Sequence, residues 1–271
     1  MQAGAPYRDS RARGAPDVLV CAGLDPSGGA GLIADVRVIS ELGARPVGVV
    51  TAETVQNTTG VIDCHAGDPE VIGHQLSVLL TDVEVRAVKI GMVGSSAVAR
   101  AIASALELVG APVVWDPVLY PSRGDVRFAD SLFGEAVSVL APHLALITPN
   151  ARELAFLTDL PTATLAEAER AATVLAAKLS CAVLVKAGHL ADPADVAVDV
   201  LVGAGDRHEL RHPRLPGGEH VHGTGCALSS AIAAHLALGH ALPVACTRAA
   251  DFVHARIAAP VAPGRGAAAV L

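Results

Sequence analysis

The sequence predicts an α/β fold in which helices cover both faces of a central, mostly parallel β-sheet. Short runs of Val, Leu and Ile alternate along the chain with longer Ala- and Leu-rich segments of helical length. The short runs are apolar at every position, which indicates strands that are buried on both faces. Because 52% of the 271 residues are hydrophobic, one large core can form. We therefore expect residues 17–271 to form a single domain after a disordered lead-in, residues 1–16.

The expected elements follow this alternation along the chain. The strands are the short apolar runs Val18–Cys21, Val47–Val50, Ala87–Lys89, Val113–Trp115, Leu144–Ile147 and Ala182–Val185. The helices are Gly31–Leu42, Pro69–Leu80, Ala97–Leu108, Arg152–Leu157, Leu165–Leu179, Thr224–Leu238 and Pro243–Ile257. The polar segment Asp192–Pro216 predicts a hairpin at the sheet edge. Ligands of such sheets bind at the carboxyl ends of the strands, so we expect the functional site there.

Composition excludes several classes of function. The net charge is −7 and no basic stripe is visible, which argues against nucleic acid as a partner. The uncharged stretch Val221–Thr247 contains three His and is broken by Gly239 and Pro243, so it indicates two buried helices rather than a membrane span. The five cysteines include no CxxC pair, which favours a reducing, cytoplasmic location over a disulfide framework or zinc site.

A glycine-rich turn follows the first expected strand, in the segment Ala22–Gly31. Its four glycines allow the backbone to approach a ligand closely and leave free N–H groups at the start of the next helix. The plain alternative is a tight turn that needs glycine for its backbone conformation. The spacing matches neither a Walker A loop nor a dinucleotide fingerprint.

A second glycine pair opens the uncharged helix in the segment Val221–Ala227. Gly223 and Gly225 leave several N–H groups directed at one point, where the helix dipole adds positive charge. This predicts an anion hole for a transferring phosphoryl group. Cys226 falls in the first turn, where the pKa of a thiol tends to be lowered. The alternative is a buried cysteine that only packs against the sheet.

Polar residues follow three more of the expected strands. Asn150 and Glu153 have the spacing of a capping box, and Glu153 could also organise Mg²⁺. Asp116 and Lys186 each come directly after an apolar run. A Lys in that position needs an anionic partner, such as a phosphate.

Taken in order, these segments resemble hydroxymethylpyrimidine/phosphomethylpyrimidine kinases. The similar motifs are AGLDPSGGAGLIAD, TAETVQNTTGV, KIGMVG, WDPVL, LITPNARE, LVKAGHL and HGTGCALSSAIAAHLALG. The resemblance extends from about Val18 to about Val270. It implies a ribokinase-like three-layer sandwich and an enzyme that uses ATP and Mg²⁺. The implied reaction phosphorylates 4-amino-5-hydroxymethyl-2-methylpyrimidine and then its monophosphate, in thiamine biosynthesis.

The resemblance also implies roles for particular residues. Those that fall where the family holds the pyrimidine are Gly23, Thr54, Gln56 and Met92, with Asp35 reaching the substrate from the same glycine-rich motif. Gly223, Thr224, Gly225 and Cys226 fall on the anion hole, with Cys226 as the base or a positioning group. Asn150, Lys186 and Asp116 are expected on the nucleotide side, with Glu153 as the residue that organises the metal.

The chain departs from the family pattern after the WDPVL motif. Ser122 stands where relatives commonly have Lys, and Arg123 follows it, which bears on the second phosphorylation. Two other functions stay open: a pyridoxal/pyridoxine kinase, and a non-catalytic module that senses the pyrimidine or ATP. We expect a homodimer.

Overall fold

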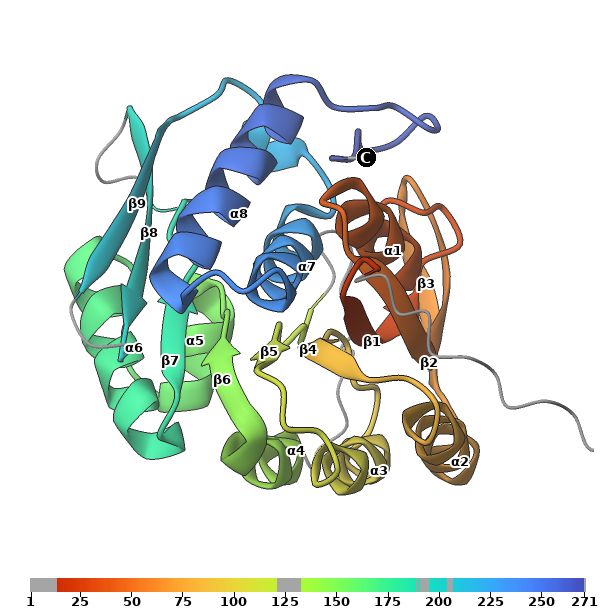
Figure 1. Cartoon of the computed structure of the whole chain (residues 1–271). Helices are drawn as coiled ribbons and strands as arrows, with labels where there is room; N and C mark the ends of the chain where they lie inside the picture. The colour runs from red at the N-terminus through yellow and green to blue at the C-terminus, as the bar shows by residue number, and fades with distance from the viewer. Residues whose placement is uncertain (1–13, 121–132, 189, 191–194, 204–206, 271) are drawn as a thin grey trace, which may run out of the picture.

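The computed structural model describes residues 14–120, 133–188, 190, 195–203 and 207–270. Strands of the described residues form one nine-stranded sheet in the order β3-β2-β1-β4-β5-β6-β7-β8-β9 (Figure 1). Their bounds are β1 Asp17–Leu24, β2 Arg45–Asn57, β3 Gly60–Ala66, β4 Val85–Ile90, β5 Val113–Trp115, β6 Leu144–Ile147, β7 Ala182–Val185, β8 Val196–Val202 and β9 His208–Pro213. The strands from β2 to β7 in this order are parallel, whereas β3, β8 and β9 pair antiparallel.

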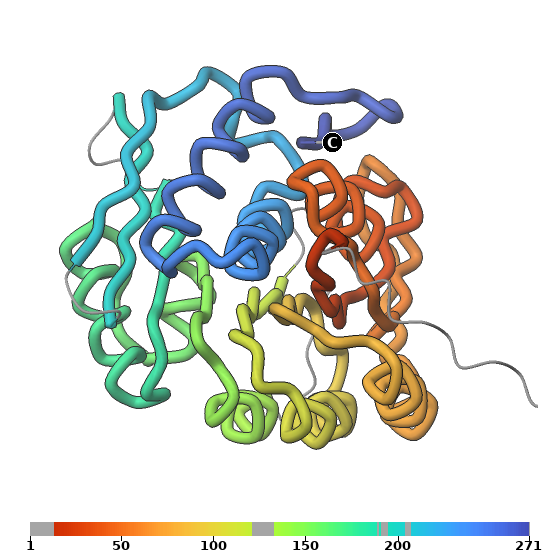
Figure 2. Tube along the Cα trace, viewed as in Figure 1, coloured from red at the N-terminus to blue at the C-terminus, as the bar shows by residue number. Residues whose placement is uncertain are grey.

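Helices cover both faces of this sheet (Figure 1). One face packs against α1 Gly31–Glu41, α7 Thr224–Ala237 and α8 Leu242–Ala258. The other packs against α2 Pro69–Leu80, α3 Ser96–Leu106, α4 Phe133–Leu140, α5 Ala151–Thr158 and α6 Leu165–Leu179. The Cα trace of Figure 2 shows the two helical layers on either side of the strands. The predicted fold class is confirmed.

Strand β1 illustrates why an unbroken apolar run suits this architecture. Leu19 and Cys21 lie in the core under α2 and α3, while Val18 and Val20 lie in the core under α1 and α7. Successive side chains of a strand point to opposite faces, so a strand in the middle layer needs apolar residues at every position.

Local sequence signals set the starts of several helices. Asp68 caps α2, and Pro69 occupies its first turn, where a missing N–H costs nothing. Capping boxes begin α5, at Asn150 and Glu153, and α6, at Thr164 and Glu167. In α5 this cap places Asn150 at the carboxyl end of β6. The site lies at this end of the strands.

The structure differs from the expected elements at two places. Strand β3, Gly60–Ala66, was not predicted because polar residues interrupt its apolar run. Among the described strands it pairs only with β2. Helix α4 is eight residues long and was also missed. The predicted edge hairpin is confirmed by the antiparallel pair β8 and β9. No helix within the described ranges has the length and apolar character needed to cross a membrane.

Candidate active site

A cavity of about 560 Å³ opens at the carboxyl ends of the parallel strands. Every predicted site residue except Asp35 lines it, namely Gly23, Thr54, Gln56, Met92, Asp116, Asn150, Glu153, Lys186, Gly223, Thr224, Gly225 and Cys226. Residues from β1, β2 and β4 form one end, and residues from β8, β9, α8 and the segments that follow β6 and β7 form the other. The sheet order therefore separates the two groups, with the start of α7 between them.

The start of α7, where the sequence predicts an anion hole, has a glycine N-cap and an open first turn. Gly223 is the N-cap, with φ of +82°, and the described residues provide no side-chain cap. The N–H groups of the first helical turn therefore have no intrahelical acceptor and remain available to an anion. A Cβ on Gly223 would lie 2.0 Å from the carbonyl oxygen of Gly29. The two glycine-rich turns thus touch, which only glycine permits.

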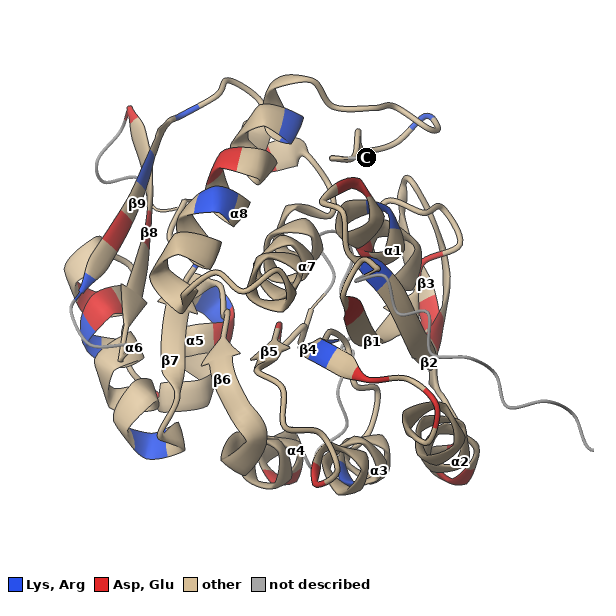
Figure 3. Cartoon of the chain, viewed as in Figure 1, with Lys and Arg blue, Asp and Glu red and all other residues tan. Residues whose placement is uncertain are grey.

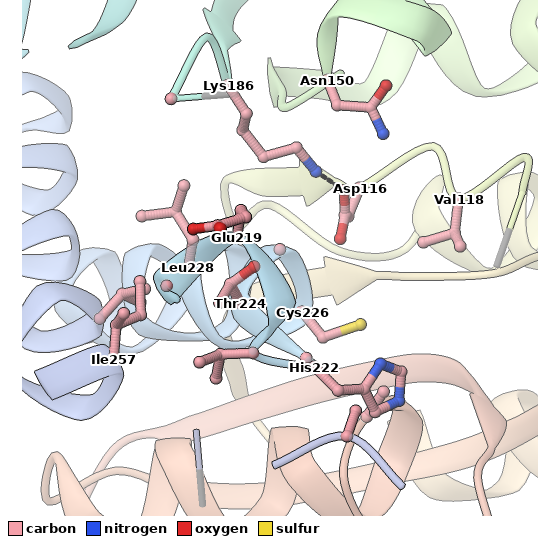
Figure 4. A pocket seen from close by; sticks show the side chains of 18 of the residues that line it. Asp116, Val118, Asn150, Lys186, Glu219, His222, Thr224, Cys226, Leu228 and Ile257 are labelled. Atoms are coloured by element: carbon pink, nitrogen blue, oxygen red, sulfur yellow. Dashed lines mark hydrogen bonds and ion pairs between the residues drawn. The ribbon is translucent and has the colours of Figure 1, made fainter. Parts of the chain in front are cut away.

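Lys186 and Asp116 form an ion pair beside this helix start (Figure 4). The Lys186 Nζ lies 2.6 Å from Oδ1 of Asp116 and 4.0 Å from Oε2 of Glu153. Burial acts to lower the pKa of Lys186, but the two carboxylates outweigh it and raise the pKa above its usual range. The ammonium group is therefore a fixed positive charge at neutral pH.

Glu153 is both a capping residue and a member of this charge cluster. Its Oε2 accepts a hydrogen bond from the backbone N–H of Asn150 at 2.8 Å, and its own N–H donates to Oδ1 of Asn150 at 2.9 Å. Burial, together with the charge of Asp116, raises the pKa of Glu153 to about 7, although Lys186 opposes the shift. The carboxyl thus changes charge near neutral pH.

The other end of the cavity is a small apolar slot. A Cβ on Gly23 would lie 2.3 Å from Cε of Met92, so glycine at this position makes room for the methionine. The hydroxyl of Thr54 donates to the carbonyl oxygen of Leu24 at 2.8 Å, which ties β2 to the loop after β1. Gln56 lies further along β2 and completes this end of the cavity.

The family model for phosphomethylpyrimidine kinase matches residues 25–271. The chain belongs to this family. It is 38% identical over 251 residues to the hydroxymethylpyrimidine/phosphomethylpyrimidine kinase of Streptomyces coelicolor, covering 93% of this chain and 92% of the relative. The crystal structure of phosphomethylpyrimidine kinase from Clostridium difficile 630 superposes with a TM-score of 0.75 at 30% identity, covering 90% of this chain and 99% of the other.

Pyridoxal kinases share the fold of this chain. The enzyme from Staphylococcus aureus, in complex with ADP, superposes with a TM-score of 0.85 at 25% identity. The alignment covers 95% of this chain and 93% of the other. The fold alone therefore does not separate the two groups of kinases.

Asp35, which the resemblance placed near the substrate, is not among the described residues that line the cavity. Its side chain is fully buried on the inner face of α1. It accepts hydrogen bonds from Lys89 at 2.6 Å and from the hydroxyl of Ser230 at 2.7 Å. The physical reason is that a buried ammonium group needs a carboxylate, and Asp35 is the one beside Lys89.

Cys226 lines the cavity, but its thiol is not acidified as its helical position suggested. Burial raises the pKa of Cys226 to about 11, and the carboxylates of Asp35 and Asp116 add to the shift. Lys89 and a hydrogen bond from the backbone N–H of Gly31 oppose it without reversing it. The helix start does not compensate for the hydration that a thiolate would lose at this position.

Three residues in or under the cavity were not predicted from the sequence. Lys89 lines it and pairs with Asp35, Asp25 follows β1, and His222 precedes α7. The signal for Lys89 was its position inside an apolar run. Asp25 and His222 both stand within motifs that carried the family resemblance, but neither has a distinguishing local pattern. Ser122 and Arg123 lie outside the described residues.

Proposed function

We propose that this chain catalyses the ATP-dependent phosphorylation of 4-amino-5-hydroxymethyl-2-methylpyrimidine and of its monophosphate, in thiamine biosynthesis. One observation carries the proposal: a single cavity holds an apolar slot with a Gln amide, the open start of α7, and the Lys186–Asp116 pair. A flat ring with a hydroxymethyl arm suits the slot, and a triphosphate suits the cationic end.

The residues divide the chemistry between positioning and charge stabilisation. Gln56, Met92 and Gly23 hold the ring so that its hydroxymethyl oxygen faces the γ-phosphoryl group. The N–H groups of Thr224, Gly225 and Cys226 stabilise charge that develops on the transferring phosphoryl group. Lys186 adds a fixed positive charge, and Asn150 binds on the nucleotide side. Cys226 contacts the substrate hydroxyl, where a protonated thiol can orient it before transfer.

The charge cluster also fits Mg²⁺, which protein sites often bind through one or two carboxylates and the substrate phosphates. Asp116 and Glu153 supply such carboxylates at the cationic end. The described residues contain no group of three or more His, Cys, Asp or Glu that would hold a metal without phosphate. When bound, Mg²⁺ neutralises phosphate charge.

The proposal is tested by a coupled ADP-release assay with a panel of acceptors: the aminopyrimidine, its monophosphate, pyridoxal and pyridoxine. We expect turnover with both pyrimidines and a kcat/KM for them well above that for either vitamin B6 compound. Turnover with the first pyrimidine alone would limit the activity to one phosphorylation. If none of the acceptors in the panel gives ADP release, the proposal is contradicted.

Pyridoxal kinase is the second candidate because of the close superposition with the Staphylococcus aureus enzyme. Both substrates are flat rings with a hydroxymethyl arm, so the slot could accept either. A higher kcat/KM for pyridoxal than for the aminopyrimidine in the same assay would favour this candidate. Failure of all acceptors to release ADP, with retained ATP binding, would favour a non-catalytic sensor.

We also propose that the enzyme is a cytoplasmic homodimer. The five cysteines are free thiols, which suits a reducing compartment. The outer edge of β3 has no partner among the described strands, and Ile62 on it is 73% exposed. Such an edge commonly needs a cover, which a second copy would supply. Analytical ultracentrifugation of the purified chain tests this, and a monomer at all concentrations would contradict it.

A further inference from the structure

The distal end of the β2–β3 hairpin extends beyond β1 at the substrate end of the cavity. The pairing of β2 with β1 ends at Glu53, opposite Leu24, whereas its pairing with β3 continues to Asn57, opposite Gly60. From Thr54 onward, β3 is therefore the only described strand that pairs with β2. A two-stranded hairpin is only marginally stable in water by itself, so this end needs further contacts to hold one position.

This hairpin end forms part of the cavity wall. Its cavity-lining residues are Gln56, Asn57, Thr58, Gly60 and Val61. Val61 also packs against the small apolar cluster of Ala52 and Met92. Met92 and Gln56 belong to the slot that receives the ring in the proposed function. The position of the hairpin end therefore decides how the acceptor substrate is held.

The C-terminal segment, residues 261–270, binds the turn of this hairpin at Thr58. The N–H of Ala267 donates to the carbonyl oxygen of Thr58 at 2.8 Å, and the N–H of Gly266 donates to its hydroxyl oxygen at 3.1 Å. A Cβ on Gly266 would lie 1.8 Å from that carbonyl oxygen, and a Cβ on Gly264 would lie 2.5 Å from the hydroxyl oxygen. The two backbones can approach this closely only because these positions have no side chain.

The same segment is bound to the residue that precedes the glycine-rich start of α7. The N–H of His222 donates to the carbonyl oxygen of Ala268 at 2.7 Å, and the N–H of Val270 donates to the carbonyl oxygen of His222 at 3.2 Å. Because Ala267 and Ala268 are adjacent in the chain, a single peptide unit links the hairpin contact to this one. The C-terminal segment therefore fixes the hairpin turn relative to the start of α7.

We propose that Gly266 is a positioning residue for the acceptor substrate, because it allows the C-terminal segment to hold the end of the β2–β3 hairpin against the start of α7. The inference rests on the proposed function. The hairpin end holds the ring, and the start of α7 stabilises the transferring phosphoryl group. A fixed distance between the two keeps the hydroxymethyl oxygen in line with the γ-phosphoryl group. A misplacement of about 1 Å can cost about 100-fold in rate.

Gly266→Ala tests the proposal, because the added methyl group would collide with the backbone of Thr58 and displace the hairpin end. We expect kcat/KM for the aminopyrimidine to fall about 100-fold. The KM for ATP, whose site is at the other end of the cavity, should stay close to that of the wild type. In the protein without substrates, amide hydrogen exchange of residues 54–61 should become faster. An unchanged kcat/KM for the aminopyrimidine would overturn the proposal, whether or not the exchange changes.

Three further variants complete the test. Gly134→Ala, in α4, is the control, because a Cβ there meets no described atom within 4 Å, and it should match the wild type in all three measurements. If Gly266→Ala does not fold, as judged by thermal unfolding, Thr58→Val and Thr58→Ser decide. Valine removes the hydroxyl that accepts from the N–H of Gly266, and serine keeps it. Valine should speed the exchange of residues 54–61 and lower kcat/KM for the aminopyrimidine, and serine should restore both. Equal results for valine and serine would overturn the proposal.

Hydrogen exchange of the protein without substrates separates this inference from the proposed function. If the wild type releases ADP with neither pyrimidine, the proposed function is contradicted, and the exchange of residues 54–61 still shows whether Gly266 holds the hairpin end. If the wild type turns over the pyrimidines and Gly266→Ala matches it in kinetics and exchange, the function remains in place and only the role of Gly266 is contradicted.

Discussion

A Cβ on Gly225 would lie 3.0 Å from the Nζ of Lys186 and 3.5 Å from Oδ2 of Asp116. The ammonium group thus lies directly against the first turn of α7, where the open N–H groups are. Figure 3 shows that the positive residues are otherwise spread over the chain, which carries a net charge of −7. A negative protein can bind a triphosphate here because this cation and the helix dipole act at one point.

Gly225→Ala should therefore reduce catalysis without unfolding the protein. The added methyl group would push the Lys186 ammonium away from the helix start, so we expect kcat to fall about 100-fold, the lower end of the range for loss of one electrostatic contact to the transition state. The KM for the pyrimidine should change little, because Gln56 and Met92 lie at the other end of the cavity. Steady-state kinetics with the aminopyrimidine and ATP measure both parameters.

Gly73→Ala is the matched control for this substitution. Gly73 lies in α2, and a Cβ there would be 3.8 Å from Cβ of Ala101, an ordinary contact. This variant should keep wild-type kinetics and be more stable by about 0.5–1 kcal/mol, because alanine favours the helix. Equal kinetics for Gly225→Ala and wild type would show that the Lys186 contact is not used in catalysis.

The buried pair of Lys89 and Asp35 predicts a large and coupled effect on stability. Both side chains are fully buried, with Nζ 2.6 Å from Oδ2. Lys89→Met leaves the carboxylate with the hydroxyl of Ser230 as its remaining partner, and we expect a loss of about 3–5 kcal/mol in the free energy of unfolding. Urea unfolding of the variant measures the loss.

The double variant Lys89→Met/Asp35→Asn shows whether the two charges act as a pair. Because it removes both charges, it should be clearly more stable than the sum of the single losses predicts. If the losses in free energy of unfolding from the two single substitutions simply add up in the double variant, the interaction between Lys89 and Asp35 is not the source of the lost stability.

Glu153 should make stability depend on pH. Its pKa is raised from 4.5 to about 7, so the folded chain binds this proton more tightly than the unfolded chain does. The contribution is complete below about pH 4.5, and it is lost as the pH rises through about 7. The shift corresponds to roughly 3 kcal/mol. Urea unfolding at pH 5, 6, 7 and 8 should show wild type losing stability relative to Glu153→Gln over this range.

Glu167 provides the control, because it holds the same position in the capping box of α6 but its hydrogen bonds there are exposed to solvent. Glu167→Gln should lower the free energy of unfolding by a similar capping contribution. The difference in stability between wild type and Glu167→Gln should not depend on pH, in contrast to the difference between wild type and Glu153→Gln. A constant difference between wild type and Glu153→Gln from pH 5 to pH 8 would show that burial does not perturb this carboxyl.

Patterns that repeat along the chain were sufficient to predict the fold. Strand β1 is apolar on both faces, and Asn150 and Glu153 form the capping box that their spacing predicts. Strand β3 was missed because it lies at an edge, where one side of the strand has no partner among the described strands and the apolar pattern weakens.

Parts of the site could not be predicted because they depend on contacts between distant segments. Asp25 and His222 are 197 positions apart in the chain, and nothing local indicates that they pair. Asp35 is a case in which a signal was present: Ala34, Asp35, Val38 and Ile39 have the spacing of one helical face, and that face is buried. The family motif suggested a ligand contact, whereas the helical period indicated the core.

The raised pKa of Cys226 changes what is expected of its reactivity. A thiol with a pKa of about 11 is almost entirely protonated at pH 7, so alkylation by iodoacetamide should be slow. The rate should rise about tenfold for each pH unit between pH 7 and pH 10, as the thiolate fraction does. Cys64 is half-buried and would also react, so the experiment uses a Cys64→Ser background and locates the adduct by mass spectrometry. Fast labelling at pH 7 would show that the thiol is acidified after all.

Cys226→Ser and Cys226→Ala separate a role in proton transfer or positioning from a role in packing. A positioned acid–base group contributes about 10²–10⁴-fold in rate, while the backbone N–H groups of α7 contribute independently of the side chain. If Cys226 is the base, both variants should lose at least about 100-fold in kcat with KM values within a few-fold of wild type. If the thiol only orients the substrate hydroxyl, serine should retain most of the rate and alanine should lose it, because serine keeps a group that can hydrogen-bond. Wild-type kcat in both variants, together with a lower melting temperature for Cys226→Ala, would assign the residue to packing. Phosphoryl transfer would then depend on the start of α7, Lys186 and the positioning of the two substrates.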